Sequence, residues 1–330
     1  MTLLPITTVG SFPKPDYLTR ARTVHARNQL SRAELTELER KATREVIALQ
    51  ERLGLDILVD GEMYRGDMTA FFAEQLEGMG TSGLVRSYGN RFYRKPIVVG
   101  EIRRPHPMTV EWFTFAQSLT RKPVKGMLTG PYTMTDWSFN EHYPSRRDTI
   151  MAFAEVIREE AEDLQRAGAQ YIQIDEPALS TRPEELPIAI EAMRVVTDGL
   201  RVKTISHMCY GDFPSIYPGL LELPVDQLDL EAANNDYALL DLIRTHPFTK
   251  EIALGVVDSH DHRIESKDEI AAGIRKALTV LKPEQVTIDP DCGLKTRTWE
   301  EAEAKLANVA AAVREVREEL VRPAETSARH

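Results

Sequence analysis

Residues 146–177 read RRDTIMAFAEVIREEAEDLQRAGAQYIQIDEP, and this stretch indicates the fold. From Arg146 to Arg166 the apolar residues recur at helical spacing, and Gly168 is a typical helix stop. The short apolar run Tyr171–Pro177 follows at once and is typical of a buried strand. A long helix that leads directly into a buried strand is a repeating unit of α/β folds.

The same alternation continues on both sides of this stretch. A capping box at Ser31–Glu34 opens a predicted helix that runs to about Leu53, where Gly54 stops it. Two more helices are predicted over 267–281 and 298–320. Eight runs rich in apolar and β-branched residues are the predicted strands: Ile6–Gly10, Asp56–Glu62, Val124–Gly130, Tyr171–Pro177, Lys203–Cys209, Gln227–Ala232, Ile252–Asp258 and Val286–Cys292. Strand–helix alternation repeated in this way predicts a (β/α)8 barrel, the TIM barrel fold.

One interval breaks the rhythm. Residues 78–107 are polar and strand-like, so we expect a β-hairpin inserted in the second βα connection. The polar tail 322–330 is expected to fray. Since no stretch has the composition of a linker between domains, we predict that residues 1–330 form a single barrel domain.

Composition excludes several classes of protein. The chain has 330 residues and a net charge of −10, so we expect no nucleic-acid or anionic-membrane partner. Its first residues lack the features of a signal peptide, and no stretch approaches the roughly 20 apolar residues of a membrane span. The two cysteines do not make a disulfide framework. We therefore expect a cytoplasmic protein whose thiols stay reduced.

Nearly every predicted strand ends in a residue capable of chemistry. In a barrel of this kind the C-terminal ends of the strands meet on one rim, where active sites lie. The sequence therefore predicts a functional rim built from the strand-end residues Ser11, Glu62, Thr129, Asp175, Glu176, His207, Cys209, Glu231, Asp258, His260 and Cys292.

His207, Cys209 and Cys292 are candidate metal ligands. His207 and Cys209 are two apart on a predicted strand, so their side chains point to the same face. Two thiolates and an imidazole are a ligand set that selects zinc, and the carboxylate of Glu231 could be the fourth ligand. The spacing is not that of a zinc finger, which favours a catalytic site formed by the fold. The alternatives are an inert buried cysteine and a histidine that is only hydrogen-bonded.

Other rim residues suit an amino-acid substrate. Glu62, and either Asp175 or its neighbour Glu176, could bind a substrate ammonium. Ser11 offers a hydroxyl and a backbone N–H beside Gly10, which suits a carboxylate. Each of these residues could also be an ordinary hydrogen-bonded group of the rim.

Two more side chains are candidates for catalysis and donor binding. His260 could be a general acid, because Asp258 lies on the same predicted strand face and an adjacent carboxylate keeps an imidazole protonated and oriented. Trp137 lies in a predicted loop above the barrel, where it could stack on a flat ligand or simply fill the loop.

Long motifs in this chain resemble those of one known family, the catalytic barrel of cobalamin-independent methionine synthase. The motifs occur in order between Thr8 and about Trp299. They include Val9-Gly10-Ser11-Phe12-Pro13, Asp60-Gly61-Glu62, KPVKGMLTGP at 122–131, Ile174-Asp175-Glu176-Pro177, His207-Met208-Cys209-Tyr210 and DPDCGLKTR at 289–297.

The resemblance implies a zinc-dependent methyltransferase that converts L-homocysteine to L-methionine. It implies that the zinc ligands are His207, Cys209, Glu231 and Cys292. It further implies that the groups binding the homocysteine ammonium and carboxylate are Glu62, Asp175, Gly10 and Ser11. In members that use folate, a tryptophan matching Trp137 packs on the folate, and a histidine matching His260 donates the proton while Asp258 orients it.

Three departures leave the methyl donor open. Typical family members are much longer and carry an N-terminal barrel that helps to bind folate. After Glu62 this chain has Met63-Tyr64-Arg65-Gly66-Asp67-Met68 in place of Pro-Glu-Arg-Asn-Asp-Met, and after Glu231 it has Ala232-Ala233-Asn234-Asn235 in place of a Ser-Arg pair. Methylfolate and a methyl-corrinoid protein are both candidate donors. The alternatives to this function are methylation of another thiol, such as coenzyme M, and a non-catalytic zinc-binding regulatory protein.

Overall fold

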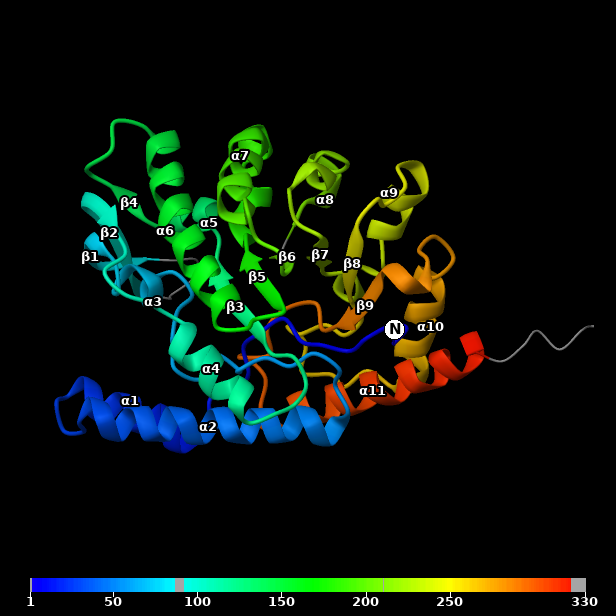
Figure 1. Cartoon of the computed structure of the whole chain (residues 1–330). Coiled ribbons are helices and arrows are strands. Elements are labelled where there is room, and N and C mark those ends of the chain that lie inside the picture. Colours follow the sequence, from blue (N-terminus) through cyan, green and yellow to red (C-terminus); the bar gives the residue numbers. More distant parts are fainter. Residues whose placement is uncertain (1, 87–91, 210, 322–330) are drawn as a thin grey trace, which may run out of the picture.

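A parallel sheet forms the centre of the computed structural model, which describes residues 2–86, 92–209 and 211–321. Six strands pair in the order β3-β5-β6-β7-β8-β9 (Figure 1). Each neighbouring pair is parallel, as expected of strands joined by long crossovers. The strands are Lys125–Thr129 (β3), Tyr171–Asp175 (β5), Lys203–Met208 (β6), Gln227–Leu230 (β7), Glu251–Gly255 (β8) and Val286–Asp289 (β9).

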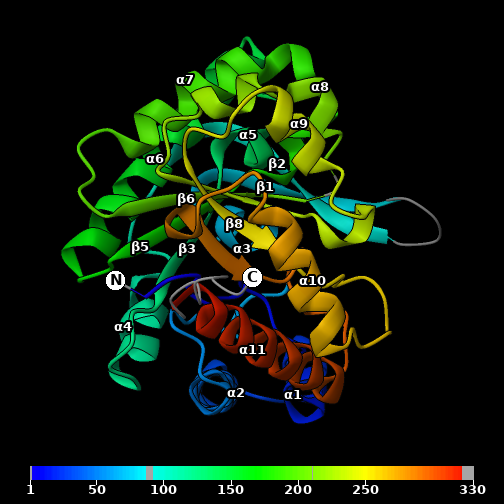
Figure 2. The same cartoon turned by 90° about the vertical axis from the view of Figure 1, so that its right-hand side faces the viewer.

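Two N-terminal segments close this sheet into a barrel. They do so through three isolated parallel bridges, which join Ile6 to Ile288, Ser11 to Gly61 and Leu58 to Val124. The predicted (β/α)8 barrel is therefore confirmed. Its last six strands form continuous ladders, and helices surround them (Figure 2). Its first two segments are held by single bridges.

The long helices form where the sequence predicts them. In α2 (Arg32–Leu53) the capping box of Ser31 and Glu34 is present, and Gly54 takes the left-handed φ of +84° that ends the helix. The helix α10 (Lys267–Ala277) is shorter than predicted, because residues 278–281 continue in tighter turns. The remaining helices of six or more residues are α1 (Asp16–Ala26), α4 (Val110–Ser118), α5 (Pro131–Asp136), α6 (Arg146–Arg166), α7 (Leu186–Thr197), α9 (Leu239–Thr245) and α11 (Trp299–Val321).

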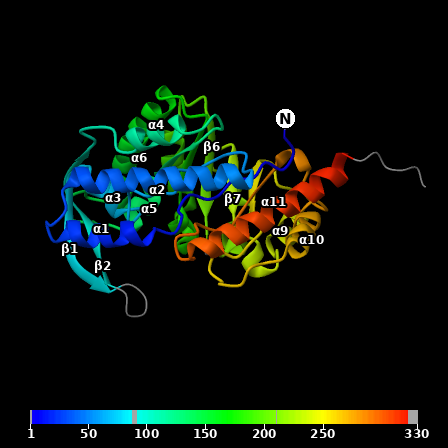
Figure 3. The ribbon, with the colours of Figure 1, turned by 90° about the horizontal axis from the view of Figure 1, so that it is seen from below.

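Apolar side chains pack between the barrel strands and the helices around them. The larger core packs barrel strands against the outer helices, for example Ile172 of β5 and Phe153 of α6. A smaller cluster around Phe12, Val46 and Leu306 lies beneath α1, α2 and α11, which cover one side of the molecule (Figure 3). Among the described residues, no helix is long and apolar enough to cross a membrane.

The interval 78–107 contains a second, smaller sheet. Its strands β1 (Glu77–Arg86) and β2 (Phe92–Arg103) are antiparallel, and the short β4 (Phe139–Asn140) pairs with β2. The connection at 87–91 and the tail 322–330 lie outside the described residues. This sheet stands at one end of the molecule, beside α3 (Ala70–Ala73) and α6 (Figure 1).

Candidate functional site

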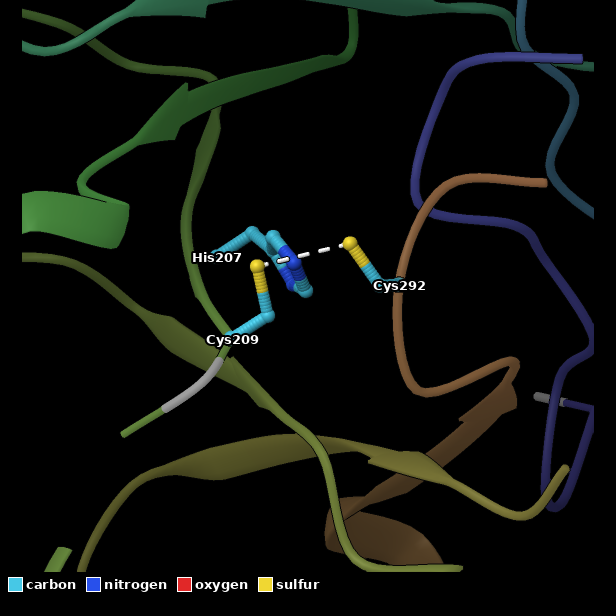
Figure 4. A group of neighbouring side chains, drawn as sticks. All are labelled: His207, Cys209 and Cys292. Atoms are coloured by element: carbon cyan, nitrogen blue, oxygen red, sulfur yellow. Dashed lines mark hydrogen bonds between the residues drawn. The ribbon is translucent and has the colours of Figure 1, made fainter. Parts of the chain in front are cut away.

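Three potential metal ligands meet on the C-terminal rim of the barrel. His207 belongs to β6, Cys209 follows the end of that strand, and Cys292 lies in the loop after β9. Their ligand atoms all lie within 4.8 Å of one another, and the two sulfurs are 3.4 Å apart. Figure 4 shows His207 and Cys209 extending from one segment toward Cys292 on another. The predicted period-two arrangement therefore brings these side chains together.

The imidazole of His207 is oriented by a carboxylate behind it. Its Nδ1 lies 2.9 Å from Oδ1 of Asp229 on β7, so this nitrogen donates to the carboxylate and Nε2 is left for another partner. Among the described residues, Nε2 of His207 is buried and has no hydrogen-bond partner. A buried ring nitrogen that lacks a partner and lies beside two sulfurs is a position that a bound metal ion would satisfy. The residues present therefore fit a soft or borderline metal ion.

The sulfur of Cys292 is in a setting that favours its ionised form. The hydrogen bond with Cys209 lowers the pKa of Cys292, burial raises it, and His207 and His260 lower it further. The pKa of this thiol therefore lies well below its usual value. A thiolate is the form of cysteine that binds metals.

Glu231 lies outside this group of ligand atoms. Its buried carboxylate accepts hydrogen bonds from Gly211 N–H (3.1 Å) and from Nδ2 of Asn234 (2.9 Å). Asn234 belongs to the stretch that departs from the family pattern, so this departure directly contacts the predicted fourth ligand. The structure thus brings three of the four candidate ligands together, whereas Glu231 is held outside their group by its own hydrogen bonds.

A buried carboxyl ties the loops after β7 and β9 together. Asp291, next to Cys292, accepts backbone N–H groups of Ala232 (2.9 Å), Ala233 (2.9 Å) and Asn234 (2.7 Å). Burial raises the pKa of Asp291 to about 7, although these three donors act in the opposite direction. The loops that carry Glu231 and Cys292 are therefore fixed to each other.

His260 lies beside Cys292, but its relation to Asp258 differs from the prediction. The strand β8 ends at Gly255, so the expectation that Asp258 and His260 share a strand face is wrong. Instead, the loop turns back and Asp258 Oδ1 accepts the backbone N–H of His260 at 2.7 Å. The hydrogen bond to Cys292 raises the pKa of the half-buried His260 imidazole, although burial lowers it.

Two of the predicted substrate residues lie close to glycines, one of which is next to Cys292. A Cβ added to Gly293, which follows Cys292, would lie 2.1 Å from the hydroxyl of Ser11. A Cβ added to Gly10 would lie 2.7 Å from Oε1 of Glu62. Both glycines therefore allow a close approach: Ser11 lies against Gly293, next to Cys292, and Glu62 lies against Gly10, next to Ser11.

Arg65 is a site residue that the sequence analysis did not single out. It is buried, and its Nη2 donates to Oε1 of Glu62 at 2.6 Å. Burial alone would raise the pKa of Glu62, but Arg65 outweighs it and the pKa falls below its usual value. Within the described residues, Nε and Nη1 of Arg65 have no hydrogen-bond partner. The sequence could have pointed to Arg65 through its position, because it lies only three residues after the candidate residue Glu62.

Asp175 and Glu176 separate as the strand geometry predicts. Glu176 accepts the backbone N–H groups of Tyr132 (3.0 Å) and Thr133 (2.7 Å) at the start of α5. Asp175 lies on the same strand face as Gln173, whose Nε2 donates to its Oδ1 at 2.7 Å. Burial raises the pKa of Asp175 to about 6, against the influence of His207 and Gln173.

Comparison with known proteins agrees with this geometry. The family described as the catalytic domain of cobalamin-independent synthases matches residues 4–315. The chain belongs to this family. The resemblance that its motifs indicated is therefore confirmed.

Individual family members differ in length. The chain is 39% identical to a methionine synthase of Saccharolobus solfataricus, with 98% of this chain and 97% of the relative covered. It is 43% identical to the 5-methyltetrahydropteroyltriglutamate–homocysteine methyltransferase of Streptomyces griseus, but spans only 43% of that protein. The chain thus spans less than half of one type of family member and nearly all of another.

A solved family structure has the same fold. It is a B12-independent methionine synthase from Shewanella sp. W3-18-1 in complex with selenomethionine, with a TM-score of 0.87 and 30% identity. The alignment covers 97% of this chain and 99% of that one.

Trp137, the candidate stacking residue, lies at the end of α5 and packs half-buried against the main hydrophobic core.

Proposed function

We propose that this chain is a zinc-dependent methyltransferase that methylates the thiol of L-homocysteine to give L-methionine. The observation that carries the proposal is the meeting of His207, Cys209 and Cys292 in a chain that matches a methionine synthase over nearly its full length. Two sulfurs and one imidazole suit zinc, with Glu231 as the proposed fourth and exchangeable ligand. Zinc, when bound, lowers the pKa of a thiol ligand, so that a substrate sulfur stays nucleophilic at neutral pH.

The chain's own residues bind and orient the amino acid in this proposal. Glu62 and Asp175 bind the ammonium, while Gly10 and Ser11 bind the carboxylate. The support is the contact of the Ser11 hydroxyl with Gly293, beside a proposed metal ligand. A clamp for both charged groups favours an amino-acid thiol over coenzyme M.

His260 is the proposed proton donor, with Asp258 positioning it through the backbone N–H. A methylated tertiary amine leaves poorly unless it is protonated, so a methylfolate donor needs this proton. A methyl-corrinoid donor does not need it, because reduced cobalt leaves as a stable species. Trp137 is retained as a proposed contact for a folate, and a single domain over 1–330 and a cytoplasmic location also remain predictions.

The test is methionine formation by purified, zinc-loaded protein, run in parallel with methylfolate and methylcobalamin and with homocysteine or coenzyme M as acceptor. We expect methionine from homocysteine with at least one donor. The variant His260→Gln should lose turnover with methylfolate and keep it with methylcobalamin. Protein that retains zinc but makes no methionine from either donor would disprove the proposed function.

A further inference from the structure

Ser259 joins two rim loops beside the candidate metal ligand Cys292. It follows β8 and is fully buried. Its hydroxyl donates to the carbonyl of Cys292 at 3.0 Å and accepts the N–H of Cys292 at 2.7 Å. One hydroxyl therefore uses its donor and an acceptor lone pair to hold both backbone groups of one proposed ligand.

The position of Ser259 in the chain gives these bonds a second consequence. Its neighbours are Asp258 and His260, and the carboxylate of Asp258 already fixes the backbone of His260. The bonds of Ser259 thus connect the backbone that carries the proposed proton donor to the backbone that carries a sulfur ligand. Loss of this hydroxyl would leave the N–H and carbonyl of Cys292 without these partners.

The loop that holds Ser259 is anchored from outside the barrel by a buried ion pair. Lys305 of α11 is fully buried and donates to Oε2 of Glu265 at 2.7 Å and to the carbonyl of Asp258 at 2.9 Å. Its third hydrogen bond goes to the carbonyl of Arg263. Glu265 in turn accepts the N–H of Asp258 at 2.9 Å. The pair therefore holds both backbone groups of the residue next to Ser259.

A buried ion pair at this position is not the most effective way to stabilise a fold. Desolvation of two charges often cancels their attraction, and apolar replacements of both partners are frequently neutral or stabilising. What an apolar pair cannot supply is directed hydrogen bonds to the loop at 258–263. The contacts of Lys305 and Glu265 are thus better suited to fixing geometry than to adding stability.

We propose that Ser259 and the Lys305–Glu265 pair form one positioning device, which sets the sulfur of Cys292 and the imidazole of His260 relative to each other. These are positioning residues, since none of them touches the proposed substrate. The inference rests on the proposed function only for what the metal and His260 do. Its geometric content concerns metal binding, which can be measured without turnover.

The first test compares Ser259→Ala with Ser206→Ala. Ser206 is also fully buried, but among the described residues its hydroxyl has no partner, so it controls for loss of a buried hydroxyl. We expect Ser259→Ala to bind zinc about 10–100-fold more weakly, as is usual when a partner of a metal ligand is removed. In cobalt-loaded protein, its thiolate charge-transfer and ligand-field bands should also shift. Ser206→Ala should match the unmodified protein in both measurements.

A second variant guards against a failure of the first to fold. The double substitution Lys305→Met with Glu265→Leu leaves no unpaired charge, so the variant should fold, with a modest fall in melting temperature from the hydrogen bonds lost at Asp258 and Arg263. Weaker zinc binding and an altered cobalt spectrum in either folded variant would support the device. Zinc affinity and cobalt spectra unchanged in both variants would overturn it. Both measurements are independent of methionine formation, so they distinguish a failure of this inference from a failure of the proposed function.

Discussion

The two halves of the barrel are built differently. From β5 to β9 the strands form unbroken parallel ladders, and the loops that follow them are joined by buried groups such as Asp291 and Ser259. Residues 6–11 and 58–61 are held by isolated bridges. There, Glu62 has a φ of +55°, a conformation that costs energy for a residue other than glycine.

This difference separates the proposed roles. Metal ligands need fixed positions, and the half with continuous ladders provides them. The half held by single bridges carries Ser11 and Glu62, and also Arg65 with its unused donors among the described residues. We infer that the fold preforms the metal side, whereas the substrate side is completed when a ligand supplies the missing partners.

The largest expected effect comes from breaking the metal side. Cys292→Ser should abolish zinc retention and methyl transfer, because serine is not ionised at neutral pH and is a poor zinc ligand. The fold should survive, since the ladders do not depend on the sulfur. Zinc content after dialysis and the far-UV CD spectrum check both points. Full zinc content in this variant would contradict the ligand assignment.

The next effect is on stability and concerns the substrate side. Arg65→Met leaves the carboxylate of Glu62 without its buried partner, which should lower the free energy of unfolding by about 3–5 kcal/mol. Adding Glu62→Gln should recover most of that loss, because no unpaired charge then remains. Denaturant unfolding of the two variants measures both. Equal losses in the single and double variants would mean that the ion pair does not account for the effect.

The sequence predicted the barrel well because its signals are local. Helical periodicity and the capping box at Ser31 determine where helices begin, and α2 and α6 have the predicted ends. Predicted strands were too long at their C-terminal ends, since polar rim residues lie in loops that still contain β-branched or apolar neighbours. That error produced the wrong strand-face relation between Asp258 and His260.

The sequence pointed to three candidate ligands that lie together in the structure, but not to the residues that support them. His207, Cys209 and Cys292 have unusual chemistry, so composition alone draws attention to them. Asp229, Arg65 and Ser259 are common residue types whose partners are distant in sequence. Ser259, for example, bonds to Cys292, 33 residues away. Such contacts depend on how two loops meet in space, which a single sequence does not specify.

A smaller effect should follow from a change behind a ligand rather than in it. Asp229→Asn keeps the shape of the side chain but removes the charge that orients His207. We expect zinc affinity to fall by about 10–100-fold, with the fold unchanged. Competition with a chromophoric chelator measures this loss. A variant with unchanged affinity would show that β6 alone orients the imidazole and would strengthen the view of a rigid metal side.

The smallest expected effect depends on pH and concerns Asp175, a proposed substrate residue that lies on β5, in the half with continuous ladders. Burial raises the pKa of Asp175 to about 6, so the carboxylate proposed to bind the substrate ammonium becomes protonated as the pH falls below that value. The KM for homocysteine should therefore rise below pH 6, by about tenfold per unit at the limit. Asp175→Asn should have a higher KM at neutral pH and should lose this pH dependence.

The same shift makes an opposite prediction for stability. Since the pKa of Asp175 in the folded protein lies above its ordinary value of 3.8, the unfolded chain releases this proton first as the pH rises. Ionisation of this carboxyl therefore lowers the free energy of unfolding as the pH rises from about 3.8 to 6, and the loss persists at neutral pH. Asp175→Asn should melt at a higher temperature than the unmodified protein at pH 7, although it binds substrate less well. A lower melting temperature at pH 7 would contradict this, and a gain in stability with a loss of binding would mark Asp175 as a group kept for its ligand.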